Sequence, residues 1–119
     1  MTHAFWYVQG SDEKQIIISG GPNNLNGTAY LNVGAIPTYV GDPELLAPVW
    51  WKSPLSCDIC TAVDNMLKGA NTWPQNKIPY FWKGPNSNGS ANYFGSVGGF
   101  FPTAPPESTG WDSPIPISR

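Results

Sequence analysis

The stretch that decides the fold is HAFWYVQGSDEKQIIIS, residues 3–19. Residues 3–8 are rich in aromatic and β-branched side chains, which favours a β-strand. Polar, turn-forming residues follow at 10–14, and residues 15–19 contain three consecutive isoleucines. Two such segments joined by a polar turn predict an antiparallel hairpin. Three isoleucines in a row indicate burial on both faces, so we expect the second strand to be a central one.

The next part of the chain alternates loop-like and strand-like segments. Residues 20–24 read Gly-Gly-Pro-Asn-Asn, which predicts a loop. Residues 28–36 predict a third strand. Residues 37–48 hold three prolines and predict an irregular connection. The Val-Trp-Trp segment at 49–51 is consistent with a short fourth strand or with a packed aromatic segment.

Two helices are predicted further along. In residues 57–68 the apolar side chains recur at helical spacing along one stripe, with Ser56 as the N-cap and Gly69 as the stop. A second, shorter helix is predicted over residues 87–97, entered through Asn86 as its N-cap.

The last part of the chain is rich in proline, with five prolines in residues 102–119. Such a segment is neither regular helix nor central strand. The aromatic residues Phe100, Phe101 and Trp111 nevertheless indicate that part of it packs back. We therefore predict one α+β domain over residues 1–101, a small antiparallel sheet of about four strands with two packed helices. A Pro-rich tail over residues 102–119 is expected to pack partly on it.

Composition excludes two classes of function. The chain has 119 residues, six Lys or Arg, eight Asp or Glu, and a net charge of −2. The basic residues are scattered, whereas a nucleic-acid binder needs a basic stripe. No apolar run approaches the roughly 20 residues of a membrane span. The N-terminus lacks the pattern of a signal peptide, so the localisation stays open between a secreted effector and a cytoplasmic protein.

One candidate site joins His3 to Ser87. A nucleophile and its base must meet in space, not in sequence. His3 lies on the predicted first strand, and Ser87 opens the predicted second helix, where free N–H groups suit an oxyanion. The alternative is that the run Asn-Ser-Asn at 86–88 is ordinary capping chemistry and that His3 belongs to a frayed chain start.

A histidine on an early strand followed by an Asn-Cys-Asn-like turn opening a helix resembles the circularly permuted papain-like group, which includes NlpC-type peptidases and lecithin retinol acyltransferase-like enzymes. The run 84–88, together with residues 98–100, the Pro-rich stretch 102–106 and Gly110-Trp111, also resembles domains near the C-termini of bacterial RHS-type secreted proteins. The resemblance implies a papain-like amidase, peptidase or acyltransferase, either active or inactive, from a secreted or toxin-associated bacterial protein.

The resemblance also implies roles for single residues. Ser87 stands where the group carries its nucleophilic cysteine, and a hydroxyl depends more than a thiol on a well-placed base. His3 is then the base, and Ser19 or Asn32 orients it. Substrate binding is assigned to a set around the nucleophile: Asn86, Asn88, Trp82 and Tyr80. The expected partner is a peptide or acyl/amide substrate, or a protein, and no cofactor is expected.

The pair Cys57 and Cys60 offers a different function. Two cysteines at this spacing at a helix start are typical of thioredoxin-like redox proteins. The alternative is that both are small buried residues. A zinc site would need His3 as a third ligand, and the usual second cysteine pair is absent, so no metal is expected.

Aromatic residues supply the third possibility. Tryptophan, tyrosine and phenylalanine cluster at residues 50–51, 73 and 80–82. Flat rings flanked by Asn and Gly are used in binding surfaces, so a non-catalytic binding module is an alternative function. The competing interpretation is that these rings simply build the core.

Overall fold

The computed structural model describes residues 3–9, 15–38, 49–53 and 59–117. The elements are β1 (Trp6–Gln9), β2 (Gln15–Leu25), β3 (Thr28–Pro37), α1 (Ile59–Asn71) and α2 (Ser87–Val97). The predicted α+β class with an antiparallel sheet and two helices is confirmed. The number of about four strands is not, because the described residues form three strands and residues 49–51 lie outside the sheet.

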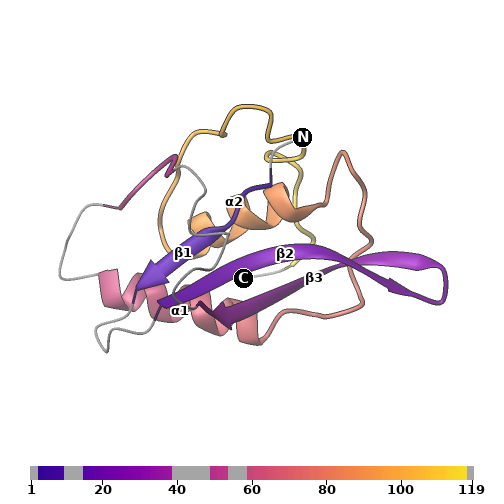
Figure 1. The fold of residues 1–119 in the computed structure, drawn as a ribbon, viewed down its shortest axis with the longest axis horizontal. Coiled ribbons are helices and arrows are strands. Elements are labelled where there is room, and N and C mark those ends of the chain that lie inside the picture. The colour runs from indigo at the N-terminus through magenta and orange to yellow at the C-terminus, as the bar shows by residue number, and fades with distance from the viewer. Residues whose placement is uncertain (1–2, 10–14, 39–48, 54–58, 118–119) are drawn as a thin grey trace.

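The sheet has the order β1-β2-β3, with antiparallel neighbours, so β2 is the central strand as predicted (Figure 1). Ile18 is paired with Trp6 of β1 on one side and Ala35 of β3 on the other. Ile17 and Ile18 point to opposite faces of the sheet, and both are buried. The expectation of burial on both faces is therefore confirmed.

β2 is longer than the sequence predicted. Residues 20–24, predicted as a loop, continue the strand, and the chain turns at Asn26 and Gly27, both with positive φ. The proline at 22 fits because it is paired with Leu31, whose own N–H donates away from β2, to Ile78. In such a pair both residues point their backbone N–H and C=O groups away from the partner strand. The nitrogen of Pro22 therefore points away from β3, to the side of β2 where β1 no longer pairs, and the missing N–H costs no hydrogen bond of the sheet.

β1 is shorter at its start than predicted. It begins at Trp6 rather than at His3. The N–H of Ala4 donates to the side chain of Asn88 at 2.7 Å instead of to a strand. The opening residues therefore leave the sheet and run to α2.

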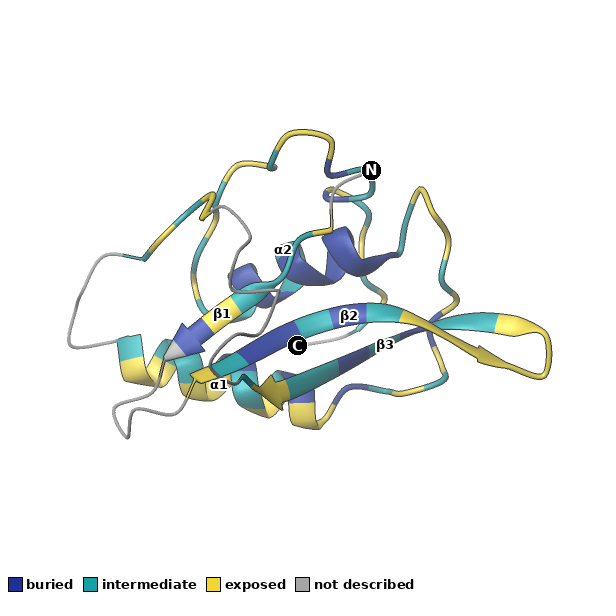
Figure 2. Ribbon diagram, in the orientation of Figure 1, coloured by how far each residue is buried: buried dark blue, intermediate teal, exposed yellow. Residues whose placement is uncertain are grey.

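The core lies between the sheet and both helices. α2 packs on β2, α1 packs on β3, and the two helices contact each other. The buried core side chains come from all five elements and the loop after α1: Val8, Ile18, Leu31, Val33, Met66, Ala70, Trp73, Ile78 and Phe94. The β2–β3 hairpin extends beyond the helices, and its tip is exposed (Figure 2).

The two predicted helices differ in outcome. α2 spans residues 87–97 with Asn86 as its N-cap, as predicted. The predicted stop of α1 at Gly69 is wrong, because the helix continues to Asn71. Gly69 lies against the ring of Phe94, where a Cβ would approach to 3.2 Å, and the next residue, Ala70, is buried in the core. The start of the predicted helix, with Ser56 and Cys57, lies outside the described residues.

The outer edge of β3 is covered by the segment that follows α1. The N–H of Tyr80 donates to the carbonyl of Ala29 at 2.9 Å. The side chain of Gln75 accepts from the N–H of Val33 and donates to its carbonyl. The indole N–H of Trp73 donates to the carbonyl of Leu31 at 2.9 Å. Residues 73–80 thus bind the outer edge of β3 in the place where a fourth strand would lie.

The contact between β2 and α2 gives a first prediction. A Cβ at Gly20 would lie 2.4 Å from the hydroxyl oxygen of Ser90, whereas a Cβ at the neighbouring Gly21 meets nothing within 4 Å. We expect Gly20→Ala to lower the free energy of unfolding by about 1–3 kcal/mol through overpacking. Gly21→Ala, the matched control, should change it by no more than about 0.5 kcal/mol. Urea unfolding of both variants measures this, and equal stabilities would contradict the close approach.

Candidate functional site

The first turn of α2 is built by asparagines around Ser87. Asn86 has an extended backbone, and its side-chain oxygen accepts from the N–H of Gly89 at 3.1 Å, which is standard N-cap geometry. The amide nitrogen of Asn86 donates to the carbonyl of Trp82 at 2.8 Å, which fixes the loop before the helix. Ser87 is therefore held at the helix start, where the sequence predicted it.

Two consecutive residues fix the opening segment beside this turn. A hydrogen bond of 2.9 Å joins Nε2 of His3 to the hydroxyl oxygen of Ser19. The next residue, Ala4, is bound through its N–H to Asn88, which follows Ser87. Figure 1 shows the first described residues, the indigo segment that leads into β1, passing the end of α2 that carries Ser87. His3 and Ser19, both predicted site residues, are thus in direct contact. The contact between the opening segment and α2 is made by Ala4, which follows His3, and by Asn88, which follows Ser87.

The position of Ser19 defines the side of β2 from which His3 is held. Gly20 faces Ser90 of α2, so Ser19 points to the other side of the strand. β1 stops opposite Ile18, which leaves this stretch of β2 without a β1 partner. Residues 3 and 4 therefore span the open edge of β2, from Ser19 to α2.

Ser87 itself is covered. Its exposed fraction is 4%, and Asn86 and Asn88 on either side are at 0%. The C-terminal tail binds these two asparagines, because both donate to the carbonyl of Thr109, at 2.9 Å and 3.0 Å. Thr109 is a site residue that sequence reasoning missed. The one signal for it was Trp111, expected to pack back and found buried at 7%.

The remaining predicted site residues either lie away from the first turn of α2 or make contacts other than those predicted. Asn32, the other candidate for orienting His3, is hydrogen-bonded through its side chain to Asn76. Tyr80 packs against the core, whereas Trp82 is exposed with Nζ of Lys83 5.0 Å from its ring centroid. Cys60 is an exposed free cysteine of α1. Cys57 lies outside the described residues.

Aromatic residues divide between core and surface. Trp73 is buried against Tyr93 and Phe94, as the core interpretation predicted. Phe81 and Trp82, in contrast, are exposed on the loop before α2.

Two further features, a metal site and a membrane-spanning helix, were sought among the described residues. Within them, His, Cys, Asp and Glu form no group of three suited to a metal ion. None of the helices in this part of the chain has the length and apolar character needed to cross a membrane.

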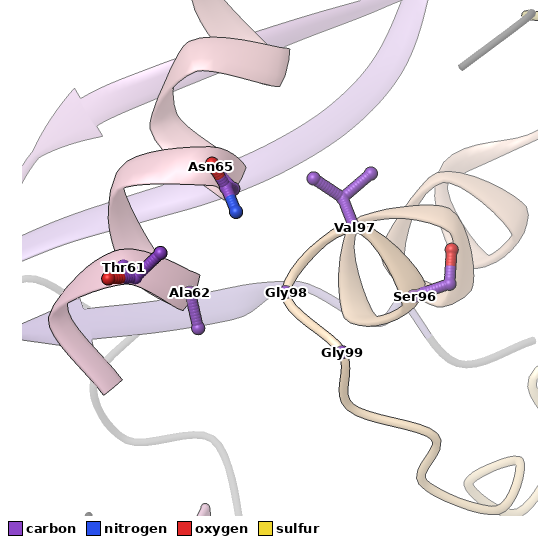
Figure 3. A pocket seen from close by; sticks show the side chains of 7 residues that line it. All are labelled: Thr61, Ala62, Asn65, Ser96, Val97, Gly98 and Gly99. Carbon is purple, nitrogen blue, oxygen red and sulfur yellow. The ribbon is translucent and has the colours of Figure 1, made fainter. Parts of the chain in front are cut away.

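A shallow pocket lies at the far end of α2 from Ser87. It is formed between α1 and α2 (Figure 3), and its lining carries no ionisable group: Thr61, Ala62, Asn65, Ser96, Val97, Gly98 and Gly99. With about 1.5 Å of rise per residue, its α2 residues are roughly 15 Å from the helix start. The pocket is therefore separate from the candidate site.

Comparison with models of known protein families, with curated proteins and with solved structures found no match. The class that the fold and the site define is a small α+β domain with a serine at a capped helix start.

Proposed function

We propose that this chain is an acyl-transfer domain of the papain-like type, an amidase, peptidase or acyltransferase with Ser87 as nucleophile and His3 as base. The observation that carries the proposal is the pair of adjacent hydrogen bonds from residues 3 and 4. One binds the imidazole to Ser19, and the other binds the following N–H to Asn88, next to Ser87. Such chemistry needs a base held by a polar neighbour and brought within hydrogen-bond reach of a nucleophile at a helix start, and the bond to Ser19 supplies the first of these two requirements.

The proposed mechanism uses both ring nitrogens of His3. With its proton on Nε2, the imidazole donates to Ser19, and Nδ1 takes the proton of the Ser87 hydroxyl. The serine oxygen attacks the carbonyl carbon of the substrate, and N–H groups of the first turn of α2 stabilise the oxyanion. His3 then returns the proton to the leaving amine, and water or a second acceptor releases the acyl group.

The second candidate function is a non-catalytic binding module, and the burial of Ser87 favours it. A nucleophile that is 4% exposed meets no substrate in this state, whereas Phe81 and Trp82 are 59% and 62% exposed. The two rings lie on the loop that enters α2, so a partner bound there would contact the same region. A resemblance to secreted bacterial proteins is compatible with either function.

A thiol at position 87 tests the enzyme proposal. In a full-length Cys57→Ser/Cys60→Ser background, Ser87→Cys is alkylated over a range of pH, with and without His3→Ala. A nearby imidazolium lowers a thiol pKa, so we expect an apparent pKa at least about one unit below the usual ~8.5. Replacing His3 should return it to the usual range.

The control is Ser19→Ala, which should weaken the effect of His3 without removing it. An apparent pKa at or above the usual value that does not change with His3→Ala would contradict the enzyme proposal and favour the binding module. Slow alkylation by itself would not, because it reports how often the site opens rather than the acidity of the thiol.

A further inference from the structure

The chain contains two Asn-Gly dipeptides, Asn26-Gly27 and Asn88-Gly89. In this dipeptide an asparagine side chain reacts most readily with the next backbone nitrogen, because glycine has no Cβ to shield that nitrogen. One dipeptide lies in an exposed hairpin turn and the other in the buried first turn of α2. The fold therefore decides which of the two asparagines is able to react.

Asn26 and Gly27 form the turn between β2 and β3. Leu25 is paired with Thr28, so the turn has two residues, and their φ values of +51° and +82° are those of a type I′ turn. Both residues are exposed, at a hairpin tip that extends beyond the helices (Figure 2). Within the described residues, neither the side chain of Asn26 nor the N–H of Gly27 is held by a hydrogen bond. The two reacting groups are thus open to water and can move without disturbing the core.

Asn88 and Gly89 are held by hydrogen bonds at both reacting groups. Asn88 has an exposed fraction of 0%, its Oδ1 accepts from the N–H of Ala4 at 2.7 Å, and its Nδ2 donates to the carbonyl of Thr109 at 3.0 Å. The N–H of Gly89, the attacking group of this dipeptide, donates to the side chain of Asn86 at 3.1 Å. Reaction here requires the first turn of α2 to unfold.

We propose that Asn26 is a site of spontaneous deamidation to aspartate and isoaspartate, from which the fold protects Asn88. The backbone nitrogen of Gly27 loses its proton to hydroxide and bonds to Cγ of Asn26, whose side-chain nitrogen takes a proton from water and leaves as ammonia. Water then opens the resulting succinimide ring. Opening at the carbonyl carbon of Cγ gives aspartate, and opening at the backbone carbonyl gives isoaspartate, in which the main chain runs through Cγ.

The two products differ in their effect on the hairpin. Both carry a new carboxylate, which lowers the net charge by one from −2. Isoaspartate also lengthens the main chain of the turn by a carbon atom, which does not fit a two-residue turn that closes Leu25 on Thr28. We expect the pairs nearest the tip to open, whereas Leu31, buried and bound through its N–H to Ile78, stays in place.

The test follows both asparagines in the full-length protein during incubation at mildly alkaline pH. Trypsin cuts after lysine, so the two dipeptides fall in separate peptides, residues 15–52 and 84–119, and mass spectrometry with fragmentation measures deamidation at each. We expect Asn26 to convert at least about ten-fold faster than Asn88 in the folded protein. In concentrated urea, where both dipeptides are exposed, the two rates should agree within about three-fold.

Asn26→Asp is the matched control for the hairpin, because it carries the new charge without the longer main chain. Backbone amide exchange at Tyr30, which is paired with Asn23, should be at least about three-fold faster in the purified isoaspartate form than in Asn26→Asp. Exchange at Leu31 should be the same in both. Equal exchange at Tyr30 would show that the turn accepts isoaspartate and would overturn this part of the inference.

Three results would overturn the deamidation site itself. Equal rates at the two asparagines in the folded protein would mean that the turn gives Asn26 no greater access. Conversion of Asn26 in urea but not in the folded protein would mean that the turn protects it. A difference between the two that persists in urea would mean that the fold does not select between them. None of these rates involves His3 or Ser87, so this inference and the enzyme proposal can each fail alone.

Discussion

Replacing Trp73 with alanine is expected to lower the free energy of unfolding by about 3–5 kcal/mol, the largest effect of any single change considered for this fold. The side chain is buried at 5%, its ring lies 5.7 Å from that of Tyr93 and 5.6 Å from that of Phe94, and its N–H binds the edge of β3. Truncation therefore leaves a cavity and removes a partner from the carbonyl of Leu31.

Chemical denaturation followed by circular dichroism measures this loss. Trp82→Ala is the matched control, because the same ring is exposed there and its removal should cost no more than about 0.5 kcal/mol. Trp73→Phe should fall between the two, since it keeps most of the ring and loses the hydrogen bond. Similar losses for Trp73→Ala and Trp82→Ala would mean that the aromatic core is not arranged as described.

Asn88→Ala is expected to lower the free energy of unfolding by about 2–4 kcal/mol and also to release residues 3 and 4 from α2. Asn88 is fully buried, accepts from the N–H of Ala4 and donates to the carbonyl of Thr109. Unpaired buried polar groups cost about 1–3 kcal/mol each. In the variant with a thiol at position 87, the enzyme proposal expects the same change to raise the thiol pKa towards its usual range, because Ala4, the residue after His3, is no longer bound to α2.

Two further variants separate these effects. Asn88→Asp keeps an acceptor for Ala4 and loses the donor to Thr109, so the opening segment should stay bound to α2 at reduced stability. Asn92→Ala, at a half-buried position with one bond to the tail, should cost only about 1 kcal/mol and leave the pKa unchanged. If Asn88→Ala shifts neither stability nor pKa, Asn88 does not connect the opening segment, the tail and the helix.

Local signals in the sequence predicted the parts of the fold that local physics controls. The limits of α2 followed from the capping potential of Asn86 and from the apolar spacing after it. The predicted second strand ends too early because Gly-Gly-Pro at 20–22 is typical of a loop, although Asn26-Gly27 is a strong hairpin signal. The tolerance of Pro22 depends on β1 stopping opposite Ile18, and no local pattern contains that information.

The candidate site was predicted in part for the same reason. Ser87 at a helix start and a contact between His3 and Ser19 both follow from residues that adjoin predicted elements. The contact of the tail with the residues on either side of Ser87 could not be predicted, because it depends on Thr109 reaching two asparagines more than twenty residues earlier. Trp111 indicated that the tail packs, but a buried ring does not specify which carbonyls are bound.

The covered outer edge of β3 bears on self-association. An open strand edge is a template on which another copy of a chain can add a strand, and this is a common route to aggregation. Here the outward backbone groups of Ala29, Leu31 and Val33 are already paired with residues 73–80. Growth of the sheet into fibrils is therefore blocked on that side without any charged residue on the strand.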